Sequence, residues 1–83
     1  MVEELEGLEG LVQFMAQNMV DDPENVQVKS QSRGRIVTVT LTVPQEDMGK
    51  VIGRQGRIAR SMRTLLTIAA SRHGYRASLD ING

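Results

Sequence analysis

Apolar and polar positions follow two periods along this chain, one helical and one extended. From residue 8 onward, apolar side chains recur at intervals of three and four, which predicts one buried face of a helix over about residues 8–20: Leu8, Leu11, Val12, Met15 and Met19. Gly7 and Gly10 weaken the start of this helix, because glycine costs about 1 kcal/mol relative to alanine in a helix interior. We therefore expect residues 1–7 to be frayed. Pro23 ends the helix, since the residue before a proline avoids helical backbone angles.

The middle of the chain alternates with the period of a strand. Val26 and Val28 alternate with polar residues, and after a turn at Arg33-Gly34 a β-branched run follows over residues 36–43. In that run, one face is apolar (Val37, Val39, Leu41, Val43) and the other carries threonines (Thr38, Thr40, Thr42). The two segments are predicted to form an antiparallel hairpin with one buried face.

Two helices and a third strand are predicted after this hairpin. Pro44 suits the first position of a helix, which has a short apolar stripe and ends at Gly53, after about two turns. A longer helix begins near Gly56 and ends near Gly74, with its predicted core face formed by Ile58, Met62, Leu65, Leu66 and Ala69. Ile68 lies off that face, where it could contact another subunit. Tyr75, Ala77, Leu79 and Ile81 alternate as a final strand.

The predicted order of elements is therefore α-β-β-α-α-β. The second and third strands are separated by two helices, so they can lie parallel in one sheet through a crossover connection. This predicts an α+β fold in which a three-stranded mixed sheet has its helices packed on one face. At 83 residues the chain has room for a single domain, residues 1–83, and shows no repeat or linker.

Composition narrows the possible functions. Apolar residues make up 40% of the chain and charged residues 24%, which is typical of a folded globular domain. Cysteine is absent, and the one histidine, His73, has no clustered carboxylates nearby. We therefore expect no catalytic site, no metal site and no cofactor. No apolar segment approaches the length of about 20 residues that crosses a bilayer, and the N-terminus does not resemble a signal peptide. A cytoplasmic protein is expected.

Charge is distributed very unevenly between the two parts of the chain. The formal net charge is zero, yet residues 1–25 hold seven acidic residues and no lysine or arginine, while residues 26–83 hold all ten of the basic ones. Five cations lie within residues 50–63 with no acidic residue between them: Lys50, Arg54, Arg57, Arg60 and Arg63. A local positive field of this kind favours a phosphate-bearing partner.

The centre of that basic segment is the turn Gly53-Arg54-Gln55-Gly56. Without β-carbons at its two ends, a sugar–phosphate backbone can approach the main chain closely, and the first amides of the next helix attract phosphate. Arg54 adds a mobile cation and Gln55 a neutral hydrogen-bonding group. A tight connection between two helices with solvated arginines is the simpler alternative, but the surrounding cations and apolar residues favour binding. The glycine spacing fits neither of the common nucleotide-binding patterns.

The segment Val51-Ile52-Gly53-Arg54-Gln55-Gly56-Arg57-Ile58 resembles the Gly-x-x-Gly signature of KH domains, which recognise RNA. The order of elements is similar to that of the type II KH form. Over nearly its full length the chain resembles the small bacterial single-KH proteins of the KhpA kind, including Val20-Asp21-Asp22-Pro23-Glu24 and Pro44-Gln45-Glu46-Asp47-Met48-Gly49-Lys50.

The resemblance implies a non-catalytic, cytoplasmic RNA-binding protein that acts as an RNA chaperone or post-transcriptional regulator, with an indirect link to control of cell shape. It further implies a homodimer, or pairing with a larger KH-containing protein of the KhpB kind. The RNA-binding residues implied by the motif and its flanks are Lys50, Ile52, Gly53, Arg54, Gln55, Gly56, Arg57, Ile58 and Arg60. The alternative is a protein-interaction or dimerisation module that uses the same fold and binds no RNA of its own.

Overall fold

A computed structural model describes residues 2–83. It contains three α-helices, three strands and three short 3-10 turns in the order α1 (Val2–Gln17), η1 (Pro23–Asn25), β1 (Gln27–Arg33), β2 (Ile36–Thr42), η2 (Gln45–Asp47), α2 (Met48–Ile52), η3 (Arg54–Gly56), α3 (Arg57–Ser71) and β3 (Arg76–Asn82). The α-β-β-α-α-β order expected from the sequence is confirmed. No helix in the described part of the chain combines the length and the apolar character that a membrane crossing requires.

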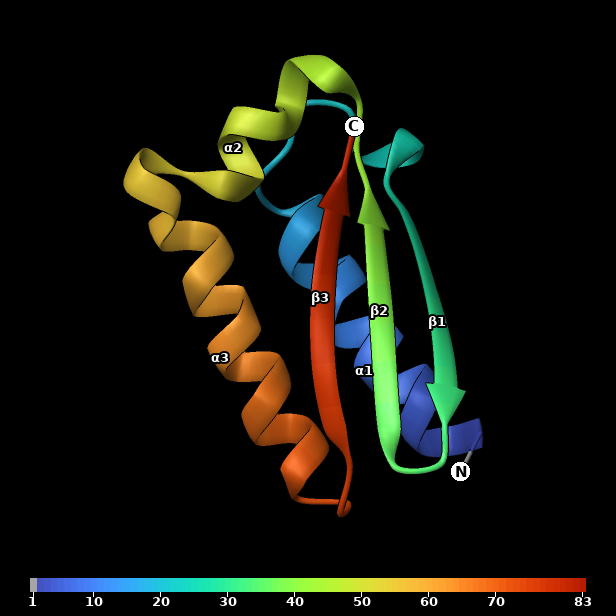
Figure 1. Ribbon diagram of the computed structural model, residues 1–83. Coiled ribbons are helices and arrows are strands. Elements are labelled where there is room, and N and C mark those ends of the chain that lie inside the picture. Colours follow the sequence, from blue (N-terminus) through green and yellow to red (C-terminus); the bar gives the residue numbers. More distant parts are fainter. Residues whose placement is uncertain (1) are drawn as a thin grey trace.

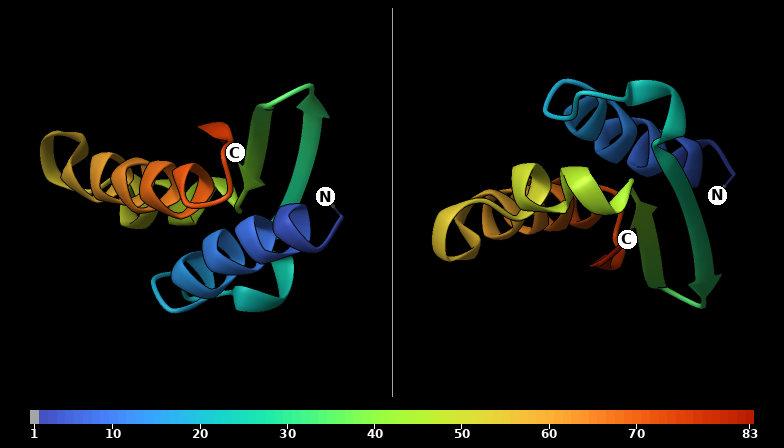
Figure 2. Two further views of the ribbon diagram at one scale, coloured as in Figure 1. Left: turned by 90° about the horizontal axis from the view of Figure 1, so that it is seen from below. Right: turned by 90° about the horizontal axis from the view of Figure 1, so that it is seen from above.

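The three strands form one mixed sheet in the order β1-β2-β3. β1 pairs with β2 antiparallel through the hairpin, and β2 pairs with β3 parallel, as the two intervening helices predict. Helices α1 and α3 lie on the same side of the sheet, and the other side is uncovered (Figures 1 and 2). The fold is therefore a two-layer α+β sandwich with one free sheet face.

The core lies between the sheet and these two helices. Val37, Val39 and Leu41 of β2 are fully buried, and they meet Val12 of α1 and Leu66 of α3 in one apolar cluster. The threonines that alternate with them point to the uncovered face and are half-buried. Strand alternation in the sequence therefore assigns the two faces of β2 correctly, because a strand in a two-layer fold is covered on one face only.

Helix α1 differs from its predicted bounds at both ends. It begins at Val2 and ends at Gln17, and its buried stripe is Leu8, Val12 and Ala16. Acidic residues near the N-terminus of a helix interact favourably with its dipole, and this opposes the weakening effect of the glycines. The predicted fraying of residues 1–7 falls partly on Met1, which lies outside the described residues, and for the others it stays a prediction.

The buried face of α3 also differs from the prediction. Its core side chains are Ala59, Met62, Leu66 and Ala70, whereas Leu65 is 49% exposed. The apolar residues of α3 form two overlapping stripes along the helix, the expected one and the observed one. The observed stripe begins and ends with alanines, and it lies against the sheet because small side chains permit close packing. Ile68, at 53% exposed, lies off the core face as predicted.

Candidate nucleic-acid interface

The Gly53-Arg54-Gln55-Gly56 loop lies at the junction of α2 and α3. In Figure 1 this yellow to gold segment projects beyond the sheet at one end of the molecule. Helix α2 ends at Ile52, the 3-10 turn η3 covers Arg54–Gly56, and α3 begins at Arg57. Arg54 and Gln55 are exposed at the tip. The loop thus presents its main chain and two polar side chains to solvent.

The backbone of this loop uses conformations that most residues avoid. Gly53 has φ 78° and ψ 175°, a region essentially confined to glycine. Gln55 (φ 57°) and Gly56 (φ 73°) are both left-handed, and Gln55 is the one non-glycine residue with positive φ in the described chain. Strained backbone persists only where surrounding structure imposes it, and it concentrates at binding sites.

Several hydrogen bonds and one close packing contact hold the loop in this shape. The Gly56 amide donates to the Gly53 carbonyl at 3.2 Å, and the Arg60 guanidinium donates to the Gln55 carbonyl at 3.2 Å. The Ile58 side chain packs directly under Gly53, where an added β-carbon would lie 2.6 Å from Ile58 Cγ1. The Arg57 amide likewise donates to the Arg54 carbonyl, so the amides that this preformed turn can present to an incoming phosphate are those of Arg54 and Gln55.

The cations around the loop differ in exposure and in the contacts that they already make, and therefore in how available they are to a phosphate. Arg54 and Arg57 are exposed, and no ion pair between described residues includes either of them. Arg60 has one contact, to the loop carbonyl, which leaves most of its donors available. Arg63 instead turns toward the sheet and donates to the Leu79 carbonyl at 3.2 Å. Arg54, Arg57 and Arg60 therefore form the loop's accessible basic surface.

Lys50 is a predicted site residue whose ion pairs could not be predicted from the sequence. Its ammonium forms an ion pair with Asp21, from the connection between α1 and β1, and a second with the buried Asp47 at 3.4 Å. The hydrogen bond to Asp21 raises the pKa of Lys50 above its ordinary value, with a smaller contribution from Asp47. Asp21 is 29 residues away in sequence, so the absence of acidic residues within 50–63 gave no signal of it. A role for Lys50 in RNA binding stays a prediction.

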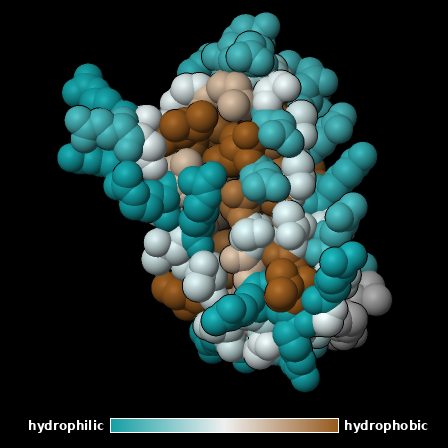
Figure 3. Space-filling model, viewed as in Figure 1, coloured by the Kyte–Doolittle hydropathy of each residue, from teal (hydrophilic) through white to brown (hydrophobic). Residues whose placement is uncertain are grey.

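An apolar surface lies beside the loop. Ile52 and Ile58 are half-buried and pack against the edge of the core. Figure 3 shows hydrophobic surface gathered between the helices at the loop end of the molecule and the neighbouring strands, bordered by hydrophilic residues. Apolar side chains next to a phosphate-attracting turn are the arrangement that can hold the bases of a short strand while its backbone lies on the loop.

Comparison with known proteins assigns this chain to a family. A family profile described as "KhpA/KhpB, KH domain" matches residues 9–81. The chain belongs to the KhpA/KhpB family of KH domains. It is 41% identical over 71 residues to the RNA-binding protein KhpA of Halalkalibacterium halodurans, a match that covers 86% of this chain and 93% of that protein.

Two further KhpA proteins show similar identity. The RNA-binding protein KhpA of Chlamydia caviae is 40% identical over 68 residues, which is 82% of this chain and 87% of that protein. The RNA-binding protein KhpA of Aquifex aeolicus is 38% identical over 77 residues, or 93% of this chain and 98% of that protein. The resemblance drawn from the sequence is thereby confirmed. These are bacterial, RNA-binding KH proteins and not enzymes.

Outside the loop, the KH domain offers little for base stacking or metal binding. Phe14 is 68% exposed on α1, and Tyr75 lies just before β3 with the Arg35 guanidinium 5.4 Å from its ring centroid. Neither aromatic residue belongs to the loop. Within the described part of the chain, no three or more metal-ligating side chains come together.

Replacing Gly53 by alanine is expected to destabilise the domain. The backbone conformation alone costs about 1–3 kcal/mol for a residue with a side chain, and the new methyl group collides with Ile58. Gly56→Ala, which meets nothing within 4 Å, is expected to cost only the left-handed penalty of about 1–2 kcal/mol. Urea unfolding measures both. Gly10→Ala, in the interior of α1 with open space around it, is the control and should slightly stabilise. A Gly53→Ala protein as stable as the parent would contradict the Ile58 contact.

Replacing Asp21 by asparagine is expected to lower the pKa of Lys50 toward its ordinary value of 10.5. Because the pKa of Lys50 is raised in the folded state, the stabilisation from this pair is fully present at neutral pH and is lost only as the pH rises above 10.5 through the raised value. An NMR titration of the Lys50 side chain measures the shift. Asp22→Asn is the matched control, since Asp22 accepts a hydrogen bond from Asn25 instead. Equal Lys50 titrations in all three proteins would rule out the Asp21 pair in solution.

Proposed function

We propose that this protein binds short single-stranded RNA without catalysis, with the 53–56 loop holding the phosphate backbone. The observation that carries the proposal is the loop itself, in which a left-handed Gln55, the Arg54 and Gln55 amides, and two arginines without an ion pair to any described residue, Arg54 and Arg57, meet at one exposed tip. The relatives named RNA-binding protein KhpA support the same ligand class.

In the proposed mode, the amides and Arg54 bind phosphate, and Gln55 donates or accepts one further hydrogen bond. Arg57 and Arg60 raise the local concentration of the strand. Phosphate contacts position a nucleic acid but do not read its sequence, and the apolar side chains of Ile52 and Ile58 pack against any base. Aromatic stacking, worth about 1–3 kcal/mol per base in other single-strand binders, is absent from the described loop. Binding by one domain is therefore expected to be weak and of low sequence specificity.

Weak binding by a single domain becomes useful when two sites act on one strand. We propose that the protein works as a homodimer or with a larger KH-containing protein of the KhpB kind, as an RNA chaperone or post-transcriptional regulator in the cytoplasm. Leu65 and Ile68, both exposed on α3 and three residues apart, are the proposed contact for a second subunit. Any effect on cell shape would follow indirectly from the RNAs that are bound.

The dependence of affinity on salt concentration is the direct test of binding to the phosphate backbone of RNA. Fluorescence anisotropy with a labelled, mixed-sequence single-stranded RNA is expected to show affinity that falls as salt rises. For two phosphates neutralised on a single strand, the slope of log K against log salt is about −1.4, which is roughly a sevenfold loss between 50 and 200 mM salt. No binding by the folded protein at either salt concentration would contradict the proposal.

The second candidate function is a protein-interaction module that binds no RNA of its own. The exposed pair Leu65 and Ile68 favours it, since large apolar side chains on a helix surface are typical of protein contacts. The two functions make different predictions for substitutions in the loop. If the loop is an RNA site, these substitutions abolish RNA retention and spare partner binding. If the fold serves only for assembly, they change neither RNA retention nor partner binding.

A further inference from the structure

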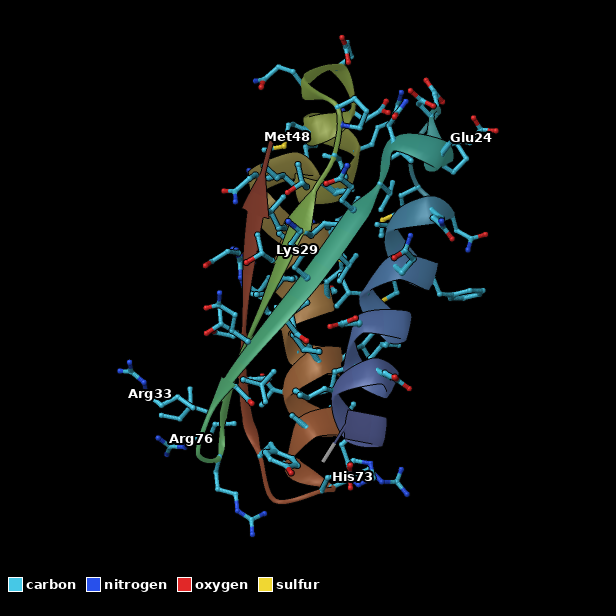
Figure 4. All side chains as sticks on the ribbon, turned by 90° about the vertical axis from the view of Figure 1, so that its right-hand side faces the viewer. Glu24, Lys29, Arg33, Met48, His73 and Arg76 are labelled. Carbon is cyan, nitrogen blue, oxygen red and sulfur yellow. The ribbon has the colours of Figure 1, made fainter. Side chains whose placement is uncertain are left out.

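A second basic surface lies at the end of the molecule opposite the 53–56 loop. We call it the basic end, and it consists of Arg33, Arg35, Arg72 and Arg76. Figure 4 shows Arg33 and Arg76 extending into solvent at the same end as His73, whereas Met48, close to the loop in sequence, lies at the other end. All four arginines are exposed, and no ion pair between described residues includes any of them.

Sheet register places two of these arginines on either side of Ile36. Arg33 of β1 is opposite Ile36 of β2, and Ile36 is opposite Arg76 of β3, so the three residues form one row across the uncovered face. Strands are about 4.8 Å apart, which puts the two arginine α-carbons roughly 10 Å apart. Ile36 between them is 55% exposed. The row is an apolar platform with a guanidinium on each side, next to a hollow lined by Gln31, Ser32 and Thr38.

The rest of the basic end is held in place by the main chain. The Arg76 amide donates to the Arg35 carbonyl at 2.8 Å, which ties the hairpin turn to the start of β3. The Arg35 guanidinium lies over the Tyr75 ring, and its Nη1 is 3.0 Å from where a β-carbon on Gly74 would lie. The turn after α3 and the β1–β2 hairpin are thus one unit, and the backbone positions of Arg35 and Arg76 keep a fixed spacing.

Helix α3, which runs from the loop to the basic end, contains no acidic residue of its own, whereas Asp80 is exposed on the uncovered sheet face. No acidic residue occurs between Asp47 and Asp80, a segment that includes all of α3. The 15 residues of α3 span about 22 Å at 1.5 Å per residue. At about 3.4 Å per stacked nucleotide, this distance corresponds to roughly six or seven nucleotides beyond those on the loop.

We propose that the basic end is a second contact for the phosphate backbone of the same RNA strand that binds the 53–56 loop. The proposal rests on the RNA binding proposed above and extends it from the loop to the uncovered sheet face. Four exposed arginines favour phosphate, because the planar guanidinium binds phosphate oxygens in pairs. The contact is expected to matter only for strands long enough to reach both surfaces.

The test compares two unstructured RNAs, a tetramer and a dodecamer, with the parent protein and with the double variant R33Q/R76Q. The variant is expected to bind the dodecamer about five- to tenfold more weakly and to lose about 1.4 from the salt slope, as for two phosphate contacts on a single strand. Its affinity for the tetramer should change less than twofold. Equal losses for the two RNAs, or no loss for the dodecamer, would overturn the proposal.

Two control variants show whether the loss depends on where the charge is removed. Lys29→Gln removes one positive charge from the same sheet face, in a row that also contains Asp80, and should change dodecamer binding less than Arg76→Gln does. The loop variant R54D/Q55D tests the proposed function separately, since it should weaken tetramer binding by about ten- to a hundredfold whether or not the basic end takes part.

An octaglutamate peptide tests whether the basic end binds an acidic protein instead of RNA. We expect no binding of this peptide that depends on Arg33 and Arg76, because the proposal makes the basic end a second contact for a strand that is already held by the 53–56 loop. Peptide binding that is lost in R33Q/R76Q, with dodecamer binding unchanged, would assign the basic end to an acidic protein and overturn the proposal.

Discussion

Replacing Arg54 and Gln55 together by aspartate is expected to lower the affinity for a short single-stranded RNA by about ten- to a hundredfold. The double substitution changes the charge at the loop tip from positive to negative and removes a charge-assisted contact worth about 1.5–3 kcal/mol. It also places two carboxylates where the Arg54 and Gln55 amides would otherwise receive a phosphate. Fluorescence anisotropy at fixed salt measures the loss.

The fold should be unaffected by this change, because both side chains are exposed at the tip of the loop. Circular dichroism and urea unfolding check that expectation. Gln27→Glu combined with Lys29→Glu is the matched control, since it introduces the same change of charge at two positions of β1. Unchanged affinity in the loop variant, or an equal loss in the control, would contradict a specific role for the loop.

Replacing Leu66 by alanine is expected to have the largest effect on stability. Leu66 is fully buried between α3 and the sheet, and truncating a buried leucine costs about 2–5 kcal/mol through lost burial and the cavity left behind. A domain of 83 residues has a free energy of unfolding of roughly 4–12 kcal/mol. The substitution therefore removes a large part of the total, and we expect the Tm to fall by about 10 °C or more.

The neighbouring residue supplies the matched control. Leu65→Ala is the same truncation one position earlier in the same helix, but Leu65 is 49% exposed. It should cost well under half as much as Leu66→Ala when both are measured at a protein concentration low enough to prevent association. Equal losses would mean that α3 is rotated about its axis relative to the sheet, with Leu65 also in the core.

Much of this fold follows from local patterns in the sequence. The alternation of valines and threonines over residues 36–43 identifies β2 and its buried face, because a strand covered on one side must place apolar residues at every second position. Gly34 and Gly74, both with positive φ, mark the two turns where the sequence places them. The tight turn at Gly53 and Gly56 was likewise recognisable, since its glycines adopt angles that other residues avoid.

Contacts between distant segments could not be predicted in the same way. Leu65 and Leu66 are equally apolar and adjacent, so helical period alone does not decide which of them meets the sheet. The ion pair of Lys50 with Asp21 depends on where the α1–β1 connection runs, which is a property of the folded chain. Arg33 and Arg76 are far apart in sequence and fall in one row, on either side of Ile36, only through the register of β1, β2 and β3.

The central claim, that the 53–56 loop holds an RNA backbone, is tested most directly by NMR titration of the ¹⁵N-labelled protein with an unstructured RNA tetramer. We expect the largest amide shifts at Arg54, Gln55, Gly56 and the first residues of α3, with smaller shifts near Ile52 and Ile58. The amides of the uncovered sheet face should change little with so short a strand. Shifts centred on the sheet or on the exposed side of α3 around Leu65, with the loop amides unmoved, would contradict the account.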